Sequence, residues 1–331
     1  MLNNEELFWK NKRILVTGAT GLIGSWLVND LLKKGAKVVV FINNLNRSSE
    51  LYLSGNVSCV TVFEGSIENF STVEKIIKKN EFNTIFHLAS TNLNYGNNFS
   101  PLSTFETNIR GTYNLLEACR LFGNKSTKIV VVSSMEACND HNMGPNENNI
   151  THAYHPYEAS KKCVEIISQA YQNNYSINIS IVRCPNTYGG GDFNWDRLIP
   201  GTIRSVLRSE SPIIRSDGTL MRSYIYVLDL VEALLLVSKN SFLQSDSNII
   251  YNFEESELLS SLEIVKNIIN ISNQANLTPI IKNYSKDEKK YQKTFLENTV
   301  NDLGWVLNYN INKGLSETFK WYSKHIDIVT Q

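Results

Sequence analysis

A tyrosine and a lysine four residues apart, Tyr157 and Lys161 in the segment YEASK, are the chain's clearest candidates for catalysis. On a helix this spacing places both side chains on one face. A lysine cation stabilises a neighbouring phenolate, so the tyrosine can accept a proton from a hydroxyl group near neutral pH. Ser134 ends the apolar run before this helix and completes the predicted set. The three residue types predict a site that deprotonates an alcohol.

Three glycines spaced as GxxGxxG, Gly18, Gly21 and Gly24, lie between a short apolar run and a helical pattern. Glycine lets the backbone turn sharply and approach a phosphate, and the N–H groups and dipole of the following helix attract the anion. Thr17 opens this loop. We therefore expect the loop to bind the pyrophosphate of NAD or NADP.

The end of the second apolar run usually carries an acid for the adenosine ribose of NAD. This chain has no carboxylate there. Asn43 can bond a ribose hydroxyl instead, whereas the nearby Arg47 can meet a 2′-phosphate. The choice between NAD and NADP therefore stays open.

Alternating strand and helix patterns must position these residues. Apolar or β-branched runs predict strands at 13–17, 37–42, 58–63, 84–90, 128–134 and 179–184, with helical patterns at 22–34, 71–79, 103–122 and 156–174 between them. Strands joined through helices favour right-handed parallel crossovers. We expect an α/β fold of the Rossmann type, a doubly wound parallel sheet.

After about residue 185 the alternation weakens, and helical patterns follow at 197–208, 227–239 and 259–272. We predict a dinucleotide-binding domain over residues 1–185 and a smaller C-terminal lobe that binds the substrate, mainly within residues 186–331. No Pro/Ser linker separates the two parts, so the chain is expected to weave between them.

The composition argues against several classes of protein. Lys plus Arg and Asp plus Glu number 32 each, so the basic surplus of a nucleic-acid binder is missing. No apolar run approaches the roughly 18 residues of a membrane span. The five cysteines form no CxxC pair, and His141, His152 and His155 lie in a polar loop without an acid-rich cluster, so no metal site is expected. Buried free thiols and a start without a signal-like apolar core predict a cytoplasmic protein.

Six segments together resemble the extended short-chain dehydrogenase/reductase family over nearly the whole chain: TGATGLIG (17–24), HLAS (87–90), TNIRGTYNLLEA (107–118), VVSS (131–134), YEASK (157–161) and RCPNTYGGGD (183–192). Within this family the chain is most similar to bacterial CDP-glucose 4,6-dehydratases. That similarity rests on residues 8–27, on GGGDFNWDRLIP (189–200) and on DLGW (302–305).

The resemblance implies a nucleotide-sugar enzyme that keeps NAD or NADP through its cycle. It implies that Tyr157 takes the proton from sugar O4, that Ser134 bonds the same oxygen, and that Lys161 also holds the nicotinamide ribose. Further cofactor contacts are implied for Leu22, Ile23, Ser66, Ile67, Leu88, Ala89, Ser90 and Asn108, and substrate contacts for Asn186, Arg197, Leu198, Arg215 and Arg222, with Arg222 near the diphosphate.

The family also pairs subunits through the helices expected at 103–122 and 156–174. The resemblance therefore implies a homodimer. The sequence itself offers only the apolar residues of these helices, such as Leu115, Leu116, Ile166 and Ile167, and these can face the sheet instead.

One position departs from the dehydratases. There the strand ends in Ser or Thr followed by Asp, and the Asp protonates the departing C6 hydroxyl; here the chain reads Ser134-Met135-Glu136. A thioether has no proton to give, although Glu136 can still act as a base. We therefore expect oxidation at C4 without elimination, which makes 4-epimerisation the leading hypothesis. The alternatives are a nucleotide-hexose 4,6-dehydratase, a nucleotide-glucuronate decarboxylase, and a non-catalytic nucleotide sensor on the same fold.

Overall fold

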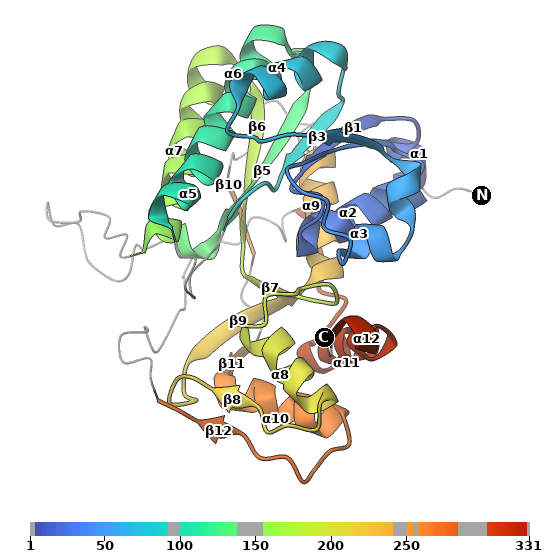
Figure 1. Cartoon of the computed structure of the whole chain (residues 1–331). Coiled ribbons are helices and arrows are strands. Elements are labelled where there is room, and N and C mark those ends of the chain that lie inside the picture. The colour runs from blue at the N-terminus through green and yellow to red at the C-terminus, as the bar shows by residue number, and fades with distance from the viewer. Residues whose placement is uncertain are drawn as a thin grey trace, which may run out of the picture.

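A seven-stranded parallel sheet forms the centre of the molecule in the computed structural model, which describes residues 4–91, 100–137, 155–240, 250–253, 257–283 and 303–329. Its strand order is β10-β6-β5-β4-β1-β2-β3. The strands are β1 (Arg13–Thr17), β2 (Lys37–Ile42), β3 (Thr61–Glu64), β4 (Thr84–His87), β5 (Lys128–Ser134), β6 (Asn178–Cys184) and β10 (Ile250–Asn252). This order, which runs outward from β1 in both directions, confirms the predicted Rossmann-type fold (Figure 1).

Helices cover both faces of the sheet. Helices α2 (Leu22–Lys33) and α9 (Val227–Asn240) pack on one face, and α4 (Phe70–Lys79), α6 (Gly111–Phe122) and α7 (Pro156–Tyr175) on the other (Figure 1). Successive strand residues point to opposite faces. Ile14 and Val16 of β1 therefore enter the first core, whereas Leu15 enters the second.

Three expected elements differ in the structure. The strand expected at 58–63 begins at Thr61, because residues Asn56–Cys59 form a turn of 3₁₀ helix (η1); β3 pairs only with β2 and is mostly exposed. The strand expected at 84–90 ends at His87, and residues 88–90 continue without regular structure. The long helix expected at 103–122 begins at Pro101 and is interrupted.

The interruption is a π-helical turn, η2 (Glu106–Arg110), between α5 (Pro101–Phe105) and α6. The Asn108 side chain lies within this turn. Its amide donates to Ser160 Oγ (2.8 Å) and to the Thr91 carbonyl (3.1 Å), and its oxygen accepts from the Thr91 N–H (2.8 Å). These bonds to two other segments stabilise a turn that helical periodicity alone does not predict.

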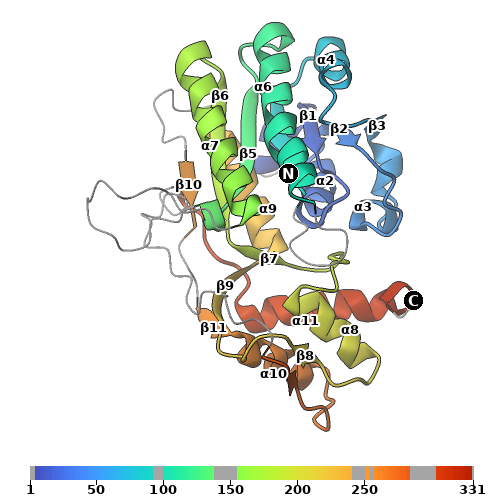
Figure 2. The same cartoon turned by 60° about the vertical axis from the view of Figure 1, so that its left-hand side comes forward.

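A smaller lobe lies below the carboxyl ends of the strands (Figure 2). It contains the three-stranded sheet of β7 (Asn186–Tyr188), β9 (Met221–Tyr226) and β11 (Leu258–Ser260), the helices α8 (Leu198–Leu207), α10 (Ser261–Ile271) and α11 (Ile311–Lys324), and the short strands β8 (Ile213–Ile214) and β12 (Ile280–Ile281). The remaining helices are α1 (Asn4–Trp9), α3 (Glu50–Leu53) and α12 (Ile326–Val329). Helix α11 was not among the expected elements.

The chain passes between the two parts. After β9 it forms α9 on the large sheet, and β10 then pairs with β6 in parallel before β11 returns to the lobe. The proposed boundary at residue 185 thus marks the first crossing between the parts, and the two ranges stay a prediction.

Within the described residues, no helix is long and apolar enough to cross a bilayer, and no group of three or more His, Cys, Asp or Glu side chains is arranged to hold a metal ion. The four cysteines in these ranges are free, but only Cys184 is buried, and Cys59 is exposed. The expectation of buried thiols is therefore wrong for Cys59, which lies beside the exposed strand β3. Cys138, His141 and His152 lie outside the described residues.

Candidate active site

A cavity of about 700 Å³ lies between the carboxyl end of the large sheet and the smaller lobe. Its wall is formed by the glycine loop, the end of β5, the start of α7, and segments of the lobe around α8 and β9. Sixteen of the predicted site residues line it: Gly18, Gly21, Leu22, Ile23, Gly24, Leu88, Ser90, Ser134, Glu136, Tyr157, Lys161, Asn186, Arg197, Leu198, Arg215 and Arg222. The structure thus brings residues far apart in the sequence around one space.

At two positions of the glycine loop, a residue with a β-carbon would not fit. Gly18 has a φ of +70°, and a β-carbon there would lie 2.7 Å from the Ala89 nitrogen. A β-carbon on Gly24 would lie 2.3 Å from the Gly18 carbonyl oxygen. Gly21 precedes the first turn of α2 and offers no side-chain cap to it. A helix N-terminus without a capping side chain, next to glycines that leave no room for a β-carbon, fits a pyrophosphate.

A buried histidine, His87, is connected to the start of this loop by hydrogen bonds, and it was not among the predicted site residues. Thr112 Oγ1 donates to the Asn108 carbonyl (2.6 Å), so it accepts the hydrogen bond from His87 Nε2 (3.0 Å). The other ring nitrogen, His87 Nδ1, then accepts from Thr17 Oγ1 (2.8 Å). Thr17 Oγ1 also accepts the Ala89 N–H (3.1 Å). Burial lowers the pKa of His87 to about 3, so the ring is neutral. The network joins β1, β4 and α6 beneath the loop.

The proposed catalytic residues meet at the end of β5. Lys161 Nζ donates to the Val132 carbonyl (2.9 Å) and lies 5.8 Å from the centre of the Tyr157 ring. Burial lowers the pKa of Lys161 to about 8. Burial, together with the carboxylate of Glu136, raises the pKa of Tyr157, whereas Arg197 and a hydrogen bond with Ser134 act in the opposite direction. The phenol therefore depends on nearby cations and donors to ionise.

Met135 and Glu136 follow directly on β5 in a short 3₁₀ turn, η3 (Met135–Ala137). Both residues line the cavity. Met135 is 8% exposed, so its thioether occupies the wall beside Ser134. The Glu136 N–H donates to Ser134 Oγ (3.2 Å), which holds the turn against the strand.

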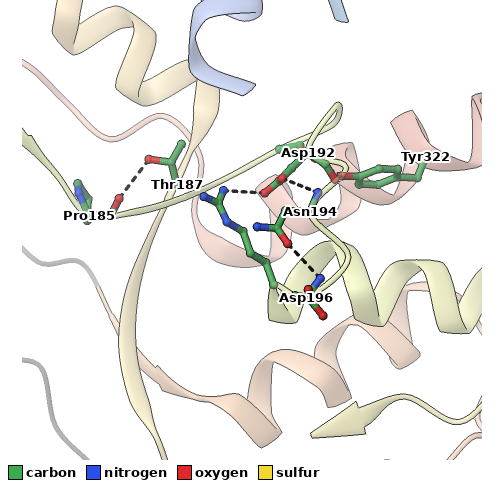
Figure 3. Close-up of polar contacts among 8 residues, drawn as sticks. Pro185, Thr187, Asp192, Asn194, Asp196 and Tyr322 are labelled. Carbon is green, nitrogen blue, oxygen red and sulfur yellow. Dashed lines mark hydrogen bonds and ion pairs between the residues drawn. The ribbon is translucent and has the colours of Figure 1, made fainter. Parts of the chain in front are cut away.

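Two carboxylates on the loop before α8 pair with two of the predicted substrate-binding arginines. Arg197 Nη1 donates to Asp192 Oδ2 (2.9 Å), and Arg215 Nη2 donates to Asp196 Oδ1 (2.5 Å). The Tyr322 hydroxyl donates to the Asp192 carbonyl (2.6 Å), so α11 holds the loop from behind (Figure 3). Asp192 and Asp196 were not among the predicted site residues, although the GGGD motif contains the first.

The other two substrate candidates lie on the lobe's central strands. The Asn186 amide donates to the Ser223 carbonyl (3.3 Å), and Arg222 Nη1 donates to the Met221 carbonyl (3.0 Å). Both residues line the cavity.

The remaining predicted cofactor residues do not line this cavity: Thr17, Asn43, Arg47, Ser66, Ile67, Ala89 and Asn108. Thr17, Ile67 and Asn108 are buried, and the Asn114 side chain bonds the Ile67 carbonyl (3.0 Å). Asn43 and Arg47 are exposed beyond the end of β2. Their roles, and the choice between NAD and NADP, stay predictions.

Comparisons with known proteins identify relatives of this chain. Residues 14–252 match the model of the NAD dependent epimerase/dehydratase family. The chain is 31% identical over 293 residues to a dTDP-D-glucose 4,6-dehydratase of Dictyostelium discoideum, covering 82% of this chain and 64% of that enzyme, which is just under two thirds of its length. It is 30% identical over 248 residues to a CDP-glucose 4,6-dehydratase of Salmonella typhimurium, covering 71% of this chain and 68% of the other.

One solved structure is similar to nearly the whole of this chain. The UDP-glucose 4-epimerase of Thermotoga maritima with UDP-glucose shares 25% identity and a TM-score of 0.79, covering 95% of this chain and 99% of the other. The matched family is NAD dependent, and these relatives are named for reactions of nucleotide sugars. The chain belongs to the NAD dependent epimerase/dehydratase family.

Proposed function

We propose that this enzyme interconverts two nucleotide hexoses that differ in configuration at C4 of the sugar. The main support for this proposal is the position of Met135. This residue lines the cavity beside Ser134, at the position where the resembling dehydratases carry the acid for loss of water. Elimination of a C6 hydroxyl needs a proton donor there, and a thioether is none. Oxidation at C4 needs no such donor.

The residues around Tyr157 support the oxidation itself. Tyr157 accepts the proton from O4 while Ser134 Oγ bonds the same oxygen, and the Lys161 ammonium stabilises the phenolate. When bound, the nicotinamide supplies an acceptor for the C4 hydride and later a donor of that hydride. After the keto sugar has turned its other face, Tyr157 returns the proton to O4. One hydride and one proton thus leave the C4–OH group, and both return to it.

Three arginines of the smaller lobe support a substrate that carries a diphosphate. Arg197, Arg215 and Arg222 line the cavity and give it three cations. We assign Arg222 to the diphosphate, as the resemblance implies. A fork of five N–H donors suits a phosphate better than a lysine does.

A 4,6-dehydratase is the second candidate. The relatives at 30% and 31% identity carry that activity in their names, and Glu136 lines the same cavity as Tyr157. In its protonated form Glu136 would supply the acid that Met135 cannot.

Proton NMR of the products from UDP-, CDP-, GDP- and dTDP-hexoses tests the proposal. We expect one nucleotide to give a mixture of C4 epimers, with the same final ratio from either epimer. Tyr157→Phe serves as the control for contaminating activity. A 4-keto-6-deoxy product from any of the nucleotides would establish the dehydratase instead.

We also propose that the enzyme is a homodimer. Leu115 and Leu116 are fully buried in the core of one chain and do not contribute to a partner contact, but Ile166 is 55% exposed. Tyr113 and Leu121 of α6 are exposed as well. Exposed apolar side chains on two neighbouring helices support pairing through α6 and α7. Sedimentation at micromolar concentration should give a dimer, and a monomer would refute it.

A further inference from the structure

A buried polar cluster lies behind the active site, on the side of the sheet that faces α7. Its centre is the carboxylate of Glu165, whose side chain is 3% exposed. Oε1 accepts from Ser133 Oγ (2.7 Å) and from Arg183 Nε (2.8 Å), and Oε2 accepts from Arg183 Nη2 (2.7 Å). All three bonds are short, and the two from Arg183 form a bidentate fork, the strongest common geometry for this pair.

The cluster joins three segments that each carry a residue of the proposed site. Ser133 precedes Ser134 on β5, Arg183 precedes the cavity-lining Cys184 on β6, and Glu165 lies one turn after Lys161 on α7. Ser133 and Arg183 are also direct partners in the parallel ladder between β5 and β6. Glu165 therefore bridges the last part of this ladder from the helix.

The alternation of side chains explains why this cluster faces α7, although Ser133 also lines the cavity at the end of β5. Ile129 and Val131 of β5, and Ile179 and Ile181 of β6, point toward α7 and form its apolar contact. Ser133 and Arg183 continue those two rows by one more step, on the same face. The contact between α7 and the sheet thus ends in a hydrogen-bonded carboxylate at the edge that carries the site.

Helix α7 has a second polar contact with β5, the bond from Lys161 to the Val132 carbonyl. The two contacts involve adjacent residues of β5 and residues one helical turn apart in α7. Together they set how far α7 lies along the strand and how it is rotated. Tyr157, one turn before Lys161, depends on that placement for its hydrogen bond with Ser134.

We propose that Glu165 is a positioning residue for the Tyr157–Lys161 pair, acting through its bonds to Ser133 and Arg183. The inference rests on the proposed roles of Tyr157 and Lys161, but not on whether the product is an epimer. A helix free to shift by a fraction of an ångström would misalign the phenol with the substrate hydroxyl. A misplacement of about 1 Å can cost on the order of 100-fold in rate.

Ser133→Ala gives the sharpest test, because it removes one hydrogen bond from the carboxylate and leaves the ion pair with Arg183 intact. The matched control is Ser168→Ala on the same helix. Ser168 is fully buried, but its hydroxyl bonds only the Val164 carbonyl of its own helix (2.7 Å). Both variants lose one buried hydroxyl, and only the first releases a contact between α7 and β5.

The step to measure is the reduction of the bound dinucleotide after mixing with nucleotide sugar, followed by absorbance, together with steady-state kcat and KM. We expect Ser133→Ala to lower the reduction rate and kcat about 10-fold, with KM for the sugar unchanged, and Ser168→Ala to match the wild type. Glu165→Asp, which keeps the charge but shortens the side chain, should lower kcat further at an unchanged KM.

Equal kcat values for Ser133→Ala and Ser168→Ala would overturn the proposal, as would a loss of Ser133→Ala activity that appears only in KM. Glu165→Gln would leave the Arg183 cation buried without its partner and risks unfolding, so the comparison does not depend on it. The C4 oxidation step is common to epimerases and dehydratases. A dehydrated product would therefore refute the proposed function while leaving this rate comparison valid.

Discussion

Replacing Gly24 by alanine tests whether the glycine loop is the cofactor site. Gly24 lies in the first turn of α2, and a β-carbon there would lie 2.3 Å from the Gly18 oxygen and 2.8 Å from the Ala19 Cα. Both neighbours are backbone atoms, so neither can turn aside as a side chain can. To restore ordinary contact the loop must move by about 1 Å, a typical case of overpacking.

Two opposing effects decide the size of the change. Alanine is favoured over glycine inside a helix by about 1 kcal/mol, whereas overpacking of this kind costs about 1–3 kcal/mol. We therefore expect a modest net loss of stability. The larger effect is on the cofactor, because a hydrogen bond to a charged group contributes about 1.5–3 kcal/mol. Losing one such bond at the pyrophosphate raises Kd by about 10- to 100-fold.

The assay is titration of NADH by fluorescence, alongside thermal denaturation without cofactor. Gly55→Ala is the control. Its β-carbon meets nothing within 4 Å, but its φ of +76° makes alanine strained by about 1 kcal/mol or slightly more. We expect Gly55→Ala to lower stability and leave Kd unchanged. A Gly24→Ala protein that binds NADH as tightly as the wild type would refute the reasoning.

Three further outcomes are expected. Tyr157→Phe should lower turnover by about 10²–10⁴, the usual loss of a general base, with the NADH Kd unchanged; wild-type turnover would exclude Tyr157 as the base. Met135→Asp should yield a detectable 4-keto-6-deoxy sugar by NMR, since a carboxyl group in this wall is held protonated by burial, and its absence would count against the role of this position. The free energy of unfolding should fall as the pH drops from 6.5 toward 3, because the unfolded chain protonates His87 while the folded chain keeps its lowered pKa. Urea titrations at several pH values should show a smaller fall in His87→Gln.

The sheet and the glycine loop could be read from the sequence because local patterns determine them. Apolar runs such as 13–17 and 128–134 are buried strands, and Gly18, Gly21 and Gly24 stand where a strand turns into a helix. The YxxxK spacing likewise places both side chains on one face of any helix. In each case the information lies within a few consecutive residues.

The missed features depend on contacts between distant segments. Nothing near Glu165 in the sequence indicates that Arg183 and Ser133 converge on it, since both lie on strands that only the folded sheet brings together. The π-turn around Asn108 is stabilised by Thr91 and Ser160, which are 17 and 52 residues away. Helix α11 has few apolar residues, so its sequence did not predict a helix. Its buried side, which includes Leu315 and Tyr322, is seen only where it packs on α10 and α8.

The mass of the product formed in D₂O tests the central proposal most directly. A 4-epimerase returns the same hydride to the same carbon, so the product should have the mass of the substrate and carry no deuterium on carbon. A 4,6-dehydratase removes the C5 proton to a base and expels water. A product lighter by one water, with deuterium bound at C5, would contradict the account. Another group would then have to supply the proton that Met135 cannot.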